Sequence, residues 1–134
     1  MKKKPSYEGL QGSIKKMKTP QIDTFNNIYS EKKYTITLET PEFTCICPKT
    51  GLPDFATIII DYIPDKLCIE LKSFKEYLLA FRQVGIFHEN AVNKILEDFT
   101  KAVSPRWAHV EGIFNTRGGI STTVSAEYKK TSVT

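Results

Sequence analysis

Hydrophobic residues follow a two-residue period on either side of the middle of the chain. Tyr34, Ile36 and Leu38 alternate with polar residues, and this pattern predicts a half-buried strand over residues 34–39. Residues 57–63 are mostly β-branched and apolar, apart from Asp61, which predicts a second strand, and residues 67–71 form a short extended piece. Two further strands are predicted over residues 107–114 and 120–128, joined by a tight turn at residues 117–119.

The middle of the chain has a helical period instead. Apolar residues recur at i, i+3, i+4 and i+7 in two stretches, and each stretch predicts a helix with one buried face. The first helix is expected to begin with a capping box of Ser73 and Glu76 and to stop near Gly85. The second is expected to have Asn90 as its N-cap and to stop before Pro105. The predicted buried faces are Phe74, Tyr77, Leu78 and Phe81 in the first helix, and Val92, Ile95, Leu96 and Phe99 in the second.

This β-β-α-α-β-β order predicts an α+β domain, with an antiparallel sheet and both helices on one of its faces. The length of 134 residues fits a single domain. Residues 1–30 are polar and have no sustained period, so we expect a basic leader that is only partly ordered. The folded domain is then expected over residues 31–134.

Composition and charge narrow the class of protein. Hydrophobic residues make up 40% of the chain and charged residues 25%, which excludes global disorder. The net charge of +4 is uneven, because residues 1–18 carry +5 and the remainder −1. A nucleic-acid-binding domain carries its basic residues on a folded face, so direct nucleic-acid binding is not expected. No apolar run approaches the ~20 residues of a membrane span, so no membrane partner is expected either.

The chain has an odd number of cysteines, Cys45, Cys47 and Cys68, and its basic N-terminus is not followed by the apolar core of a secretory signal. This combination predicts a reducing compartment, the cytoplasm, with no disulfide framework.

A loop rich in proline and glycine carries the first candidate chemistry. In residues 47–55, Cys47 stands beside polar residues that can lower the pKa of a thiol, and Asp54 could carry a proton for it. Packing against the sheet and an Asx-turn are the ordinary uses of these two residues. His88 and Glu89 lie between the helices, where capping or core packing competes with recognition of the N–H groups of a purine-like ring.

Two segments could hold phosphate. Lys72, Ser73 and Lys75 enter the first helix, and Arg117 precedes two glycines. A solvated helix face and a hairpin turn are the competing interpretations. Cys45 and Cys47, with His88 or His109, offer zinc ligands, but their C-x-C spacing differs from the knuckle of structural zinc sites. No Rossmann or P-loop signature is present.

Taken together, the motifs resemble one family. Residues 43–56, FTCICPKTGLPDFA, resemble the F-T-x-x-C-P-K-T-G-x-P-D-F-A signature of the 7-cyano-7-deazaguanine reductases. Residues 70–77, ELKSFKEY, are similar to the E-[SL]-K-S-x-K helix entry of that family. The shorter motifs FHE, PRW and RGG follow in the same order at residues 87–89, 105–107 and 117–119.

The resemblance implies a tunnelling fold, shared with GTP cyclohydrolase I, whose subunits assemble edge to edge into rings that stack in pairs. A homo-oligomer is therefore expected, a decamer of two pentamers with active sites between subunits. The implied reaction is the NADPH-dependent reduction of 7-cyano-7-deazaguanine (preQ0) to 7-aminomethyl-7-deazaguanine (preQ1) in the biosynthesis of queuosine in tRNA. NADPH is the expected co-substrate, and no metal is expected.

The resemblance also implies a function for individual residues. Cys47 would add to the nitrile as a covalent thioimide, with Asp54 as the proton donor. The remaining assignments are substrate contacts at Ile69, Glu70, Leu71, His88 and Glu89, and NADPH-phosphate contacts at Lys72, Ser73, Lys75 and Arg117.

Three alternatives stay open at this point. A zinc-dependent pterin- or purine-processing hydrolase of the same fold would need convergent Cys and His ligands. A nucleic-acid binder would use the lysine-rich leader and lose affinity with salt. Cys45, where the family more often has serine, either forms a labile disulfide with Cys47 or is silent.

Overall fold

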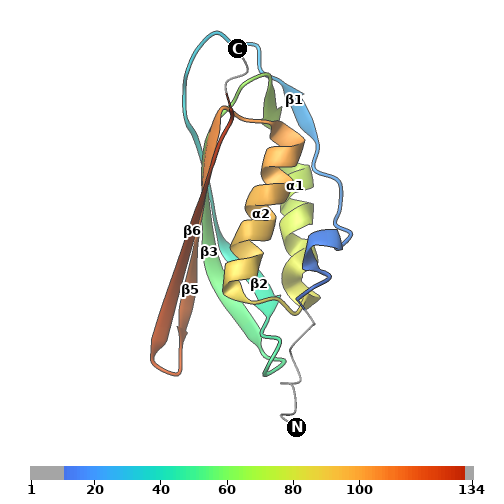
Figure 1. The fold of residues 1–134 in the computed structure, drawn as a ribbon, viewed down its shortest axis with the longest axis vertical. Helices are drawn as coiled ribbons and strands as arrows, with labels where there is room; N and C mark the ends of the chain where they lie inside the picture. Colours follow the sequence, from blue (N-terminus) through green and yellow to red (C-terminus); the bar gives the residue numbers. More distant parts are fainter. Residues whose placement is uncertain (1–10, 132–134) are drawn as a thin grey trace.

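The computed structural model describes residues 11–131 and has the α+β architecture that the sequence predicts. A four-stranded antiparallel sheet in the order β2-β3-β5-β6 is covered on one face by helices (Figure 1). A separate two-stranded sheet pairs β1 with β4. The elements are η1 (Ile14–Lys16), β1 (Thr24–Asn26), β2 (Ile36–Ile46), β3 (Pro53–Ile63), β4 (Leu67–Ile69), α1 (Leu71–Leu79), η2 (Ala80–Gln83), α2 (His88–Val103), β5 (Trp107–Arg117) and β6 (Ile120–Lys129).

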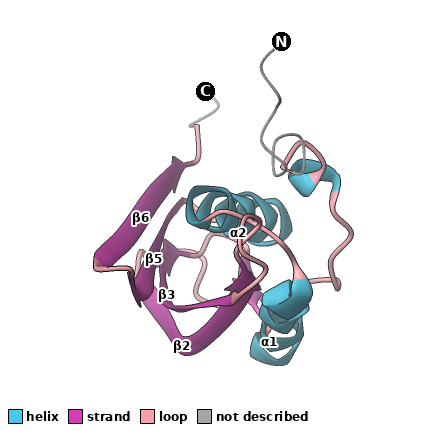
Figure 2. Ribbon diagram, turned by 90° about the horizontal axis from the view of Figure 1, so that it is seen from below, coloured by secondary structure: helices cyan, strands magenta, loops and turns pink. Residues whose placement is uncertain are grey.

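The core lies between α2 and the inner face of the sheet. Alternate residues of β3 are buried, among them Ile58, Ile60 and Tyr62, as the two-residue period predicts. Figure 2 shows α2 lying within the curve of the sheet, where it packs against β5 and β6. The predicted stripe of α2 is buried throughout, and that of the first helix is buried except at the half-exposed Leu78. Neither α1 nor α2, the two α-helices in residues 11–131, is long and apolar enough to cross a membrane.

Both predicted helix starts are wrong, for the same physical reason. Glu70, not Ser73, caps α1, because its carboxylate accepts hydrogen bonds from the amides of Lys72 and Ser73 at 2.7 and 2.8 Å. The second helix begins at His88, two residues before the predicted cap Asn90. In both places a tertiary contact occupies the predicted cap: the Ser73 hydroxyl accepts from the amide of Asp23, and the Asn90 side chain binds Gln11.

The sequence predicted the turns between strands more accurately than it predicted the lengths of the strands. Gly118 and Gly119 form the predicted tight turn, with φ of 56° and 80°, a conformation that favours glycine. The loop predicted over residues 47–55 begins as expected after β2 ends at Ile46, but it is shorter than predicted because β3 already begins at Pro53. Proline is tolerated there because the first residue of a strand can lack a ladder hydrogen bond.

Part of the predicted leader packs on the domain. Residues 11–30 contain η1 and β1, Ile14 is buried in the core, and Asp23 pairs through its carbonyl with the amide of Glu70. Residues 1–10, with three of the lysines, lie outside the described residues. The division of the chain at residue 31 stays a prediction.

Substitution of Gly112 by alanine is expected to destabilise the protein by about 1–3 kcal/mol, the usual range for overpacking a filled core. A Cβ at Gly112 would lie 2.6 Å from Val92 Cγ2 and 3.0 Å from Phe114 Cε1, so α2 would have to move away from β5. Urea unfolding measures the change. Gly85→Ala is the control, because its nearest contact would be an ordinary 3.9 Å and its unfolding free energy should change by less than about 0.5 kcal/mol. Equal midpoints for the two variants would contradict this account of the packing.

Candidate active site

One end of the sheet carries a cavity of about 390 Å³. It lies where the β2–β3 connection, the β5–β6 turn and the start of α2 meet, at the lower end of the molecule in Figure 1. Five of the residues predicted from the sequence line this one cavity: Cys47, Asp54, His88, Glu89 and Arg117. They come from three segments that are far apart in sequence, so the fold brings the predicted chemistry together.

Cys47 is held in a tight turn directly after β2. Its amide donates to the carbonyl of Leu52 at 2.8 Å, and its carbonyl accepts from the amide of Gly51 at 2.9 Å. The Thr50 hydroxyl hydrogen-bonds the sulfur and, with the amides of Thr50 and Lys49, lowers the pKa of the Cys47 thiol, although partial burial opposes this. The thiol is half-exposed, so the thiolate that these donors favour is accessible from the cavity.

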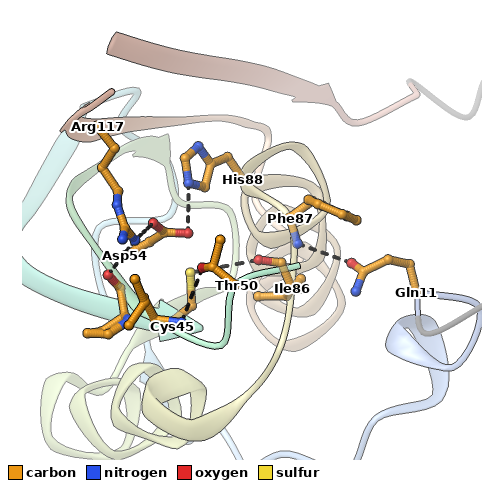
Figure 3. A network of polar contacts seen from close by, with 10 residues as sticks. Gln11, Cys45, Thr50, Asp54, Ile86, Phe87, His88 and Arg117 are labelled. Carbon is orange, nitrogen blue, oxygen red and sulfur yellow. Dashed lines mark hydrogen bonds and ion pairs between the residues drawn. The ribbon is translucent and has the colours of Figure 1, made fainter. Parts of the chain in front are cut away.

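Asp54, at the start of β3, is the buried charge of the site, with only 5% of its surface exposed. Arg117 Nη1 donates to Asp54 Oδ1 at 2.7 Å, and His88 Nε2 lies 3.1 Å from Asp54 Oδ2 (Figure 3). The same guanidinium nitrogen donates to the carbonyl of Pro53 at 2.8 Å. A buried carboxylate needs such partners, and here each of its oxygens has one.

His88 is fixed from two sides. Its ring stacks on Phe114, with centroids 3.8 Å apart and planes within 8°, while Nε2 faces Asp54. Glu89 follows in the first turn of α2, where the helix dipole favours a negative charge, and its exposed side chain lines the cavity. The site therefore offers the thiol of Cys47, the paired carboxylate of Asp54, the imidazole of His88 and the exposed carboxylate of Glu89 as a hydrogen-bond acceptor.

The other predicted site residues do not lie at this cavity. Figure 1 shows β4 and the start of α1 at the opposite end of the molecule. Ile69 and Ser73 are buried there, and the Ser73 hydroxyl donates to the carbonyl of Glu70 in addition to its bond with Asp23. Leu71, Lys72 and Lys75 are exposed on that side. In a single copy of the chain, the predicted site residues therefore form two groups, one at the cavity and one at the opposite end, around β4 and the start of α1.

Cys45 does not share the environment of Cys47. It is fully buried, its sulfur lies 3.9 Å from the carbonyl of Ile86, and burial, with smaller effects of Asp54 and Cys47, raises its pKa to about 12. All three cysteines are free thiols. Within residues 11–131, no three His, Cys, Asp or Glu side chains are grouped so that they could hold a metal ion, and the zinc interpretation finds no ligand set there.

The structure adds two residues to the site that the sequence analysis did not single out. Thr50 lies three residues after Cys47 in a turn, and hydroxyls in that position commonly bond back to a preceding group. The sequence therefore held a signal from which the contact of Thr50 with Cys47 could have been predicted. Phe114 supports the ring of His88 from the inner face of β5. Its inward position followed from the strand alternation, but its partner, on another element, did not.

Comparison with solved structures supports the fold. The crystal structure described as the archaeosine synthase QueF-Like in the apo form superposes with a TM-score of 0.67 and covers 73% of this chain and 96% of that chain. The two sequences are 24% identical, so this likeness concerns the fold alone.

Comparison of sequences identifies the family. The family model described as QueF-like protein matches residues 53–133. The NADPH-dependent 7-cyano-7-deazaguanine reductase of Chloroherpeton thalassium is 55% identical over 84% of this chain and 97% of its own length. The protein of the same name from Elusimicrobium minutum is 55% identical over 84% and 85%. This chain therefore belongs to the QueF-like family of NADPH-dependent 7-cyano-7-deazaguanine reductases.

Proposed function

We propose that this protein reduces the nitrile of preQ0 to the aminomethyl group of preQ1 with NADPH, within the biosynthesis of queuosine in tRNA. The observation that carries the proposal is the position of a thiol with a lowered pKa, Cys47, and a buried carboxyl group, Asp54, on the walls of one cavity. The names of relatives more than half identical to this chain supply the substrate and the hydride donor. We further place the reaction in the cytoplasm and in a single reductase domain over residues 31–134.

Cys47 is the nucleophile of the proposed first step. Its thiolate sulfur forms a bond to the nitrile carbon, and one carbon–nitrogen π bond breaks. The released electron pair takes up a proton on nitrogen, which gives a neutral thioimide. A nitrile by itself is a poor hydride acceptor, and the covalent step replaces it with a carbon that accepts hydride more readily.

Asp54, in its protonated form, is the proposed donor of the proton in this step. Donation leaves a carboxylate in a buried position, and that negative charge is stabilised by Arg117 on one oxygen and His88 on the other. His88, half-exposed beside the cavity, is also placed to return a proton to Asp54 between steps.

NADPH supplies hydride twice, first to the thioimide carbon and then to the imine carbon. Between the two transfers the nitrogen lone pair expels Cys47 as a thiolate, which breaks the carbon–sulfur bond and leaves the imine. In balance, each nitrile consumes two NADPH and two protons, and Cys47 is regenerated. The chain's own residues bind and orient the reactants and move the protons.

Recognition of the deazaguanine ring requires residues from both groups. Glu89 is placed to accept two hydrogen bonds from ring N–H groups, with His88 beside it. Ile69, Glu70 and Leu71 lie at the far end of the same chain, so a neighbouring copy would supply them. The two edges of the main sheet, β2 and β6, have no partner strand within the described residues, which supports assembly edge to edge. We propose a homo-oligomer, a decamer of two pentamers, with sites between subunits.

The phosphates of NADPH need cations that are accessible. Lys72 and Lys75 fit this requirement, because both are exposed on α1, and Arg117 fits in part, because it is exposed but already paired with Asp54. Ser73 is buried, and its hydroxyl already donates to the carbonyl of Glu70. We therefore propose that Ser73 positions Glu70, in addition to the phosphate contact proposed for Ser73.

Turnover tests the proposed function directly. Wild-type protein mixed with preQ0 and NADPH is expected to consume two NADPH for each preQ1 formed, measured by nicotinamide absorbance and product chromatography. Cys47→Ala is expected to lose at least about a thousandfold in rate, because it removes the covalent step. Cys68→Ala is the matched control, since Cys68 is a buried thiol that does not line the cavity. Full turnover by Cys47→Ala would contradict the proposal.

The hydroxyl of Thr50 is expected to set the reactivity of Cys47. Thr50→Val removes the side-chain hydrogen bond that most lowers the pKa of this thiol, so that pKa should rise and the thiolate fraction at neutral pH should fall. The alkylation rate of Cys47 at pH 7 should fall about two- to tenfold, which corresponds to the free energy of one hydrogen bond. The pH profile of the alkylation rate should shift to higher pH. Peptide mass spectrometry measures the rate at this site. Thr100→Val, which loses a hydroxyl on α2, should leave the profile unchanged, and an unchanged profile in Thr50→Val would refute the assignment.

A further inference from the structure

The segment that leads into α2 is hydrogen-bonded along both of its edges. On one edge, Ile46 forms an isolated parallel bridge with Gly85: the Ile46 amide donates to the carbonyl of Val84 at 2.9 Å, and the Ile86 amide donates to the carbonyl of Ile46 at 3.0 Å. Ile46 directly precedes Cys47. This edge therefore ties the start of α2 to the nucleophile.

The other edge is paired by a side chain. Gln11 Nε2 donates to the carbonyl of Gly85 at 3.1 Å. Gln11 Oε1 accepts from the amide of Phe87 at 3.1 Å, as Figure 3 shows. One carboxamide thus bonds the two backbone groups that a neighbouring strand would bond. The same oxygen accepts from Asn90 Nδ2 at 2.8 Å, within the first turn of α2. Phe87, the N-cap of this helix, makes no side-chain cap of its own.

Gln11 is itself anchored. Three residues later, Ile14 is buried in the core, and the carbonyl of Lys15 accepts from Lys94 Nζ at 3.4 Å. Lys94 lies on α2, is almost fully buried and also pairs with Asp98 at 3.0 Å. The chain around Gln11 is therefore bound to the body of α2, and its carboxamide is bound to the residues in front of that helix.

We propose that Gln11 is a positioning residue of the reductase, which fixes residues 85–87 so that His88 and Glu89 face the cavity in register with Cys47. The proposal rests on the proposed function, in which Glu89 binds the substrate ring and His88 contacts the proton donor. Gln11 touches neither substrate nor reacting atoms. It acts through the backbone of Gly85 and Phe87, and its loss should chiefly weaken substrate binding.

The test compares Gln11→Ala with Gln21→Ala in the full-length, assembled protein. Gln21 lies in the same N-terminal segment, and its side chain bonds only Asp23 among residues 11–131. The Gln21→Ala variant therefore reports the loss of a glutamine without the contact to α2. Gln11→Ala is expected to raise KM for preQ0 about three- to tenfold, with a smaller change in kcat, as the loss of one or two hydrogen bonds would give. The alkylation rate of Cys47 should stay unchanged, because its turn is held by its own loop.

A second readout does not depend on the reaction. Hydrogen exchange of the peptide over residues 84–91 should be faster in Gln11→Ala and unchanged in Gln21→Ala. If Gln11→Ala fails to fold, Gln11→Glu keeps an oxygen that accepts from Phe87 and Asn90 but replaces the donor to Gly85 by a second acceptor, and it should also raise KM for preQ0. A Gln11 variant with lower thermal stability but wild-type KM would overturn the proposal and leave Gln11 a structural contact. Absence of turnover in the wild type would instead refute the proposed function, and the exchange data would still decide whether Gln11 orders this segment.

Discussion

The inner face of the four-stranded sheet must be covered, and α2 covers it. The buried side chains of β3 and β5 form one core with those of α2, and each fully buried aliphatic or aromatic side chain contributes about 1.5–3 kcal/mol. Gly112 lets the helix approach, because a Cβ there would collide with Val92. This contact sets the height and direction of α2, and with them the place where the helix begins. His88 and Glu89 of the candidate site belong to that helix start.

The site is built from ends of elements rather than from their middles. Cys47 follows the end of β2, Asp54 stands at the start of β3, and Arg117 ends β5. Such positions combine a fixed backbone with an open side, since the ladder stops where the cavity begins. Asp54 shows the consequence most clearly, because it is buried like a core residue and yet paired with a cation and an imidazole at the cavity wall. Thr50 and the local amides tune the thiol, and Arg117 and His88 stabilise the carboxylate.

Local patterns predicted the strands, the buried faces of both helices and the two-glycine turn, because each depends on neighbouring residues. The site residues at the cavity were found through short motifs, and the fold brings these motifs together from distant parts of the chain. Contacts between distant segments were not predictable in this way. The side chain of Asn90 donates to Gln11 across 79 positions, and the amide of Asp23 donates to the hydroxyl of Ser73 across 50. Those two contacts explain why both helix caps were misplaced, since the predicted capping side chains are used elsewhere.

The central claim is that Cys47, in its turn beside Asp54, attacks the substrate and no other cysteine does. The most direct measurement is the intact mass of the reduced, assembled protein after mixing with preQ0 in the absence of NADPH. The account predicts a gain of one substrate mass per chain, located on Cys47 by peptide mapping and removed when NADPH is added. No gain in mass, or an adduct on Cys45 or Cys68, would contradict it.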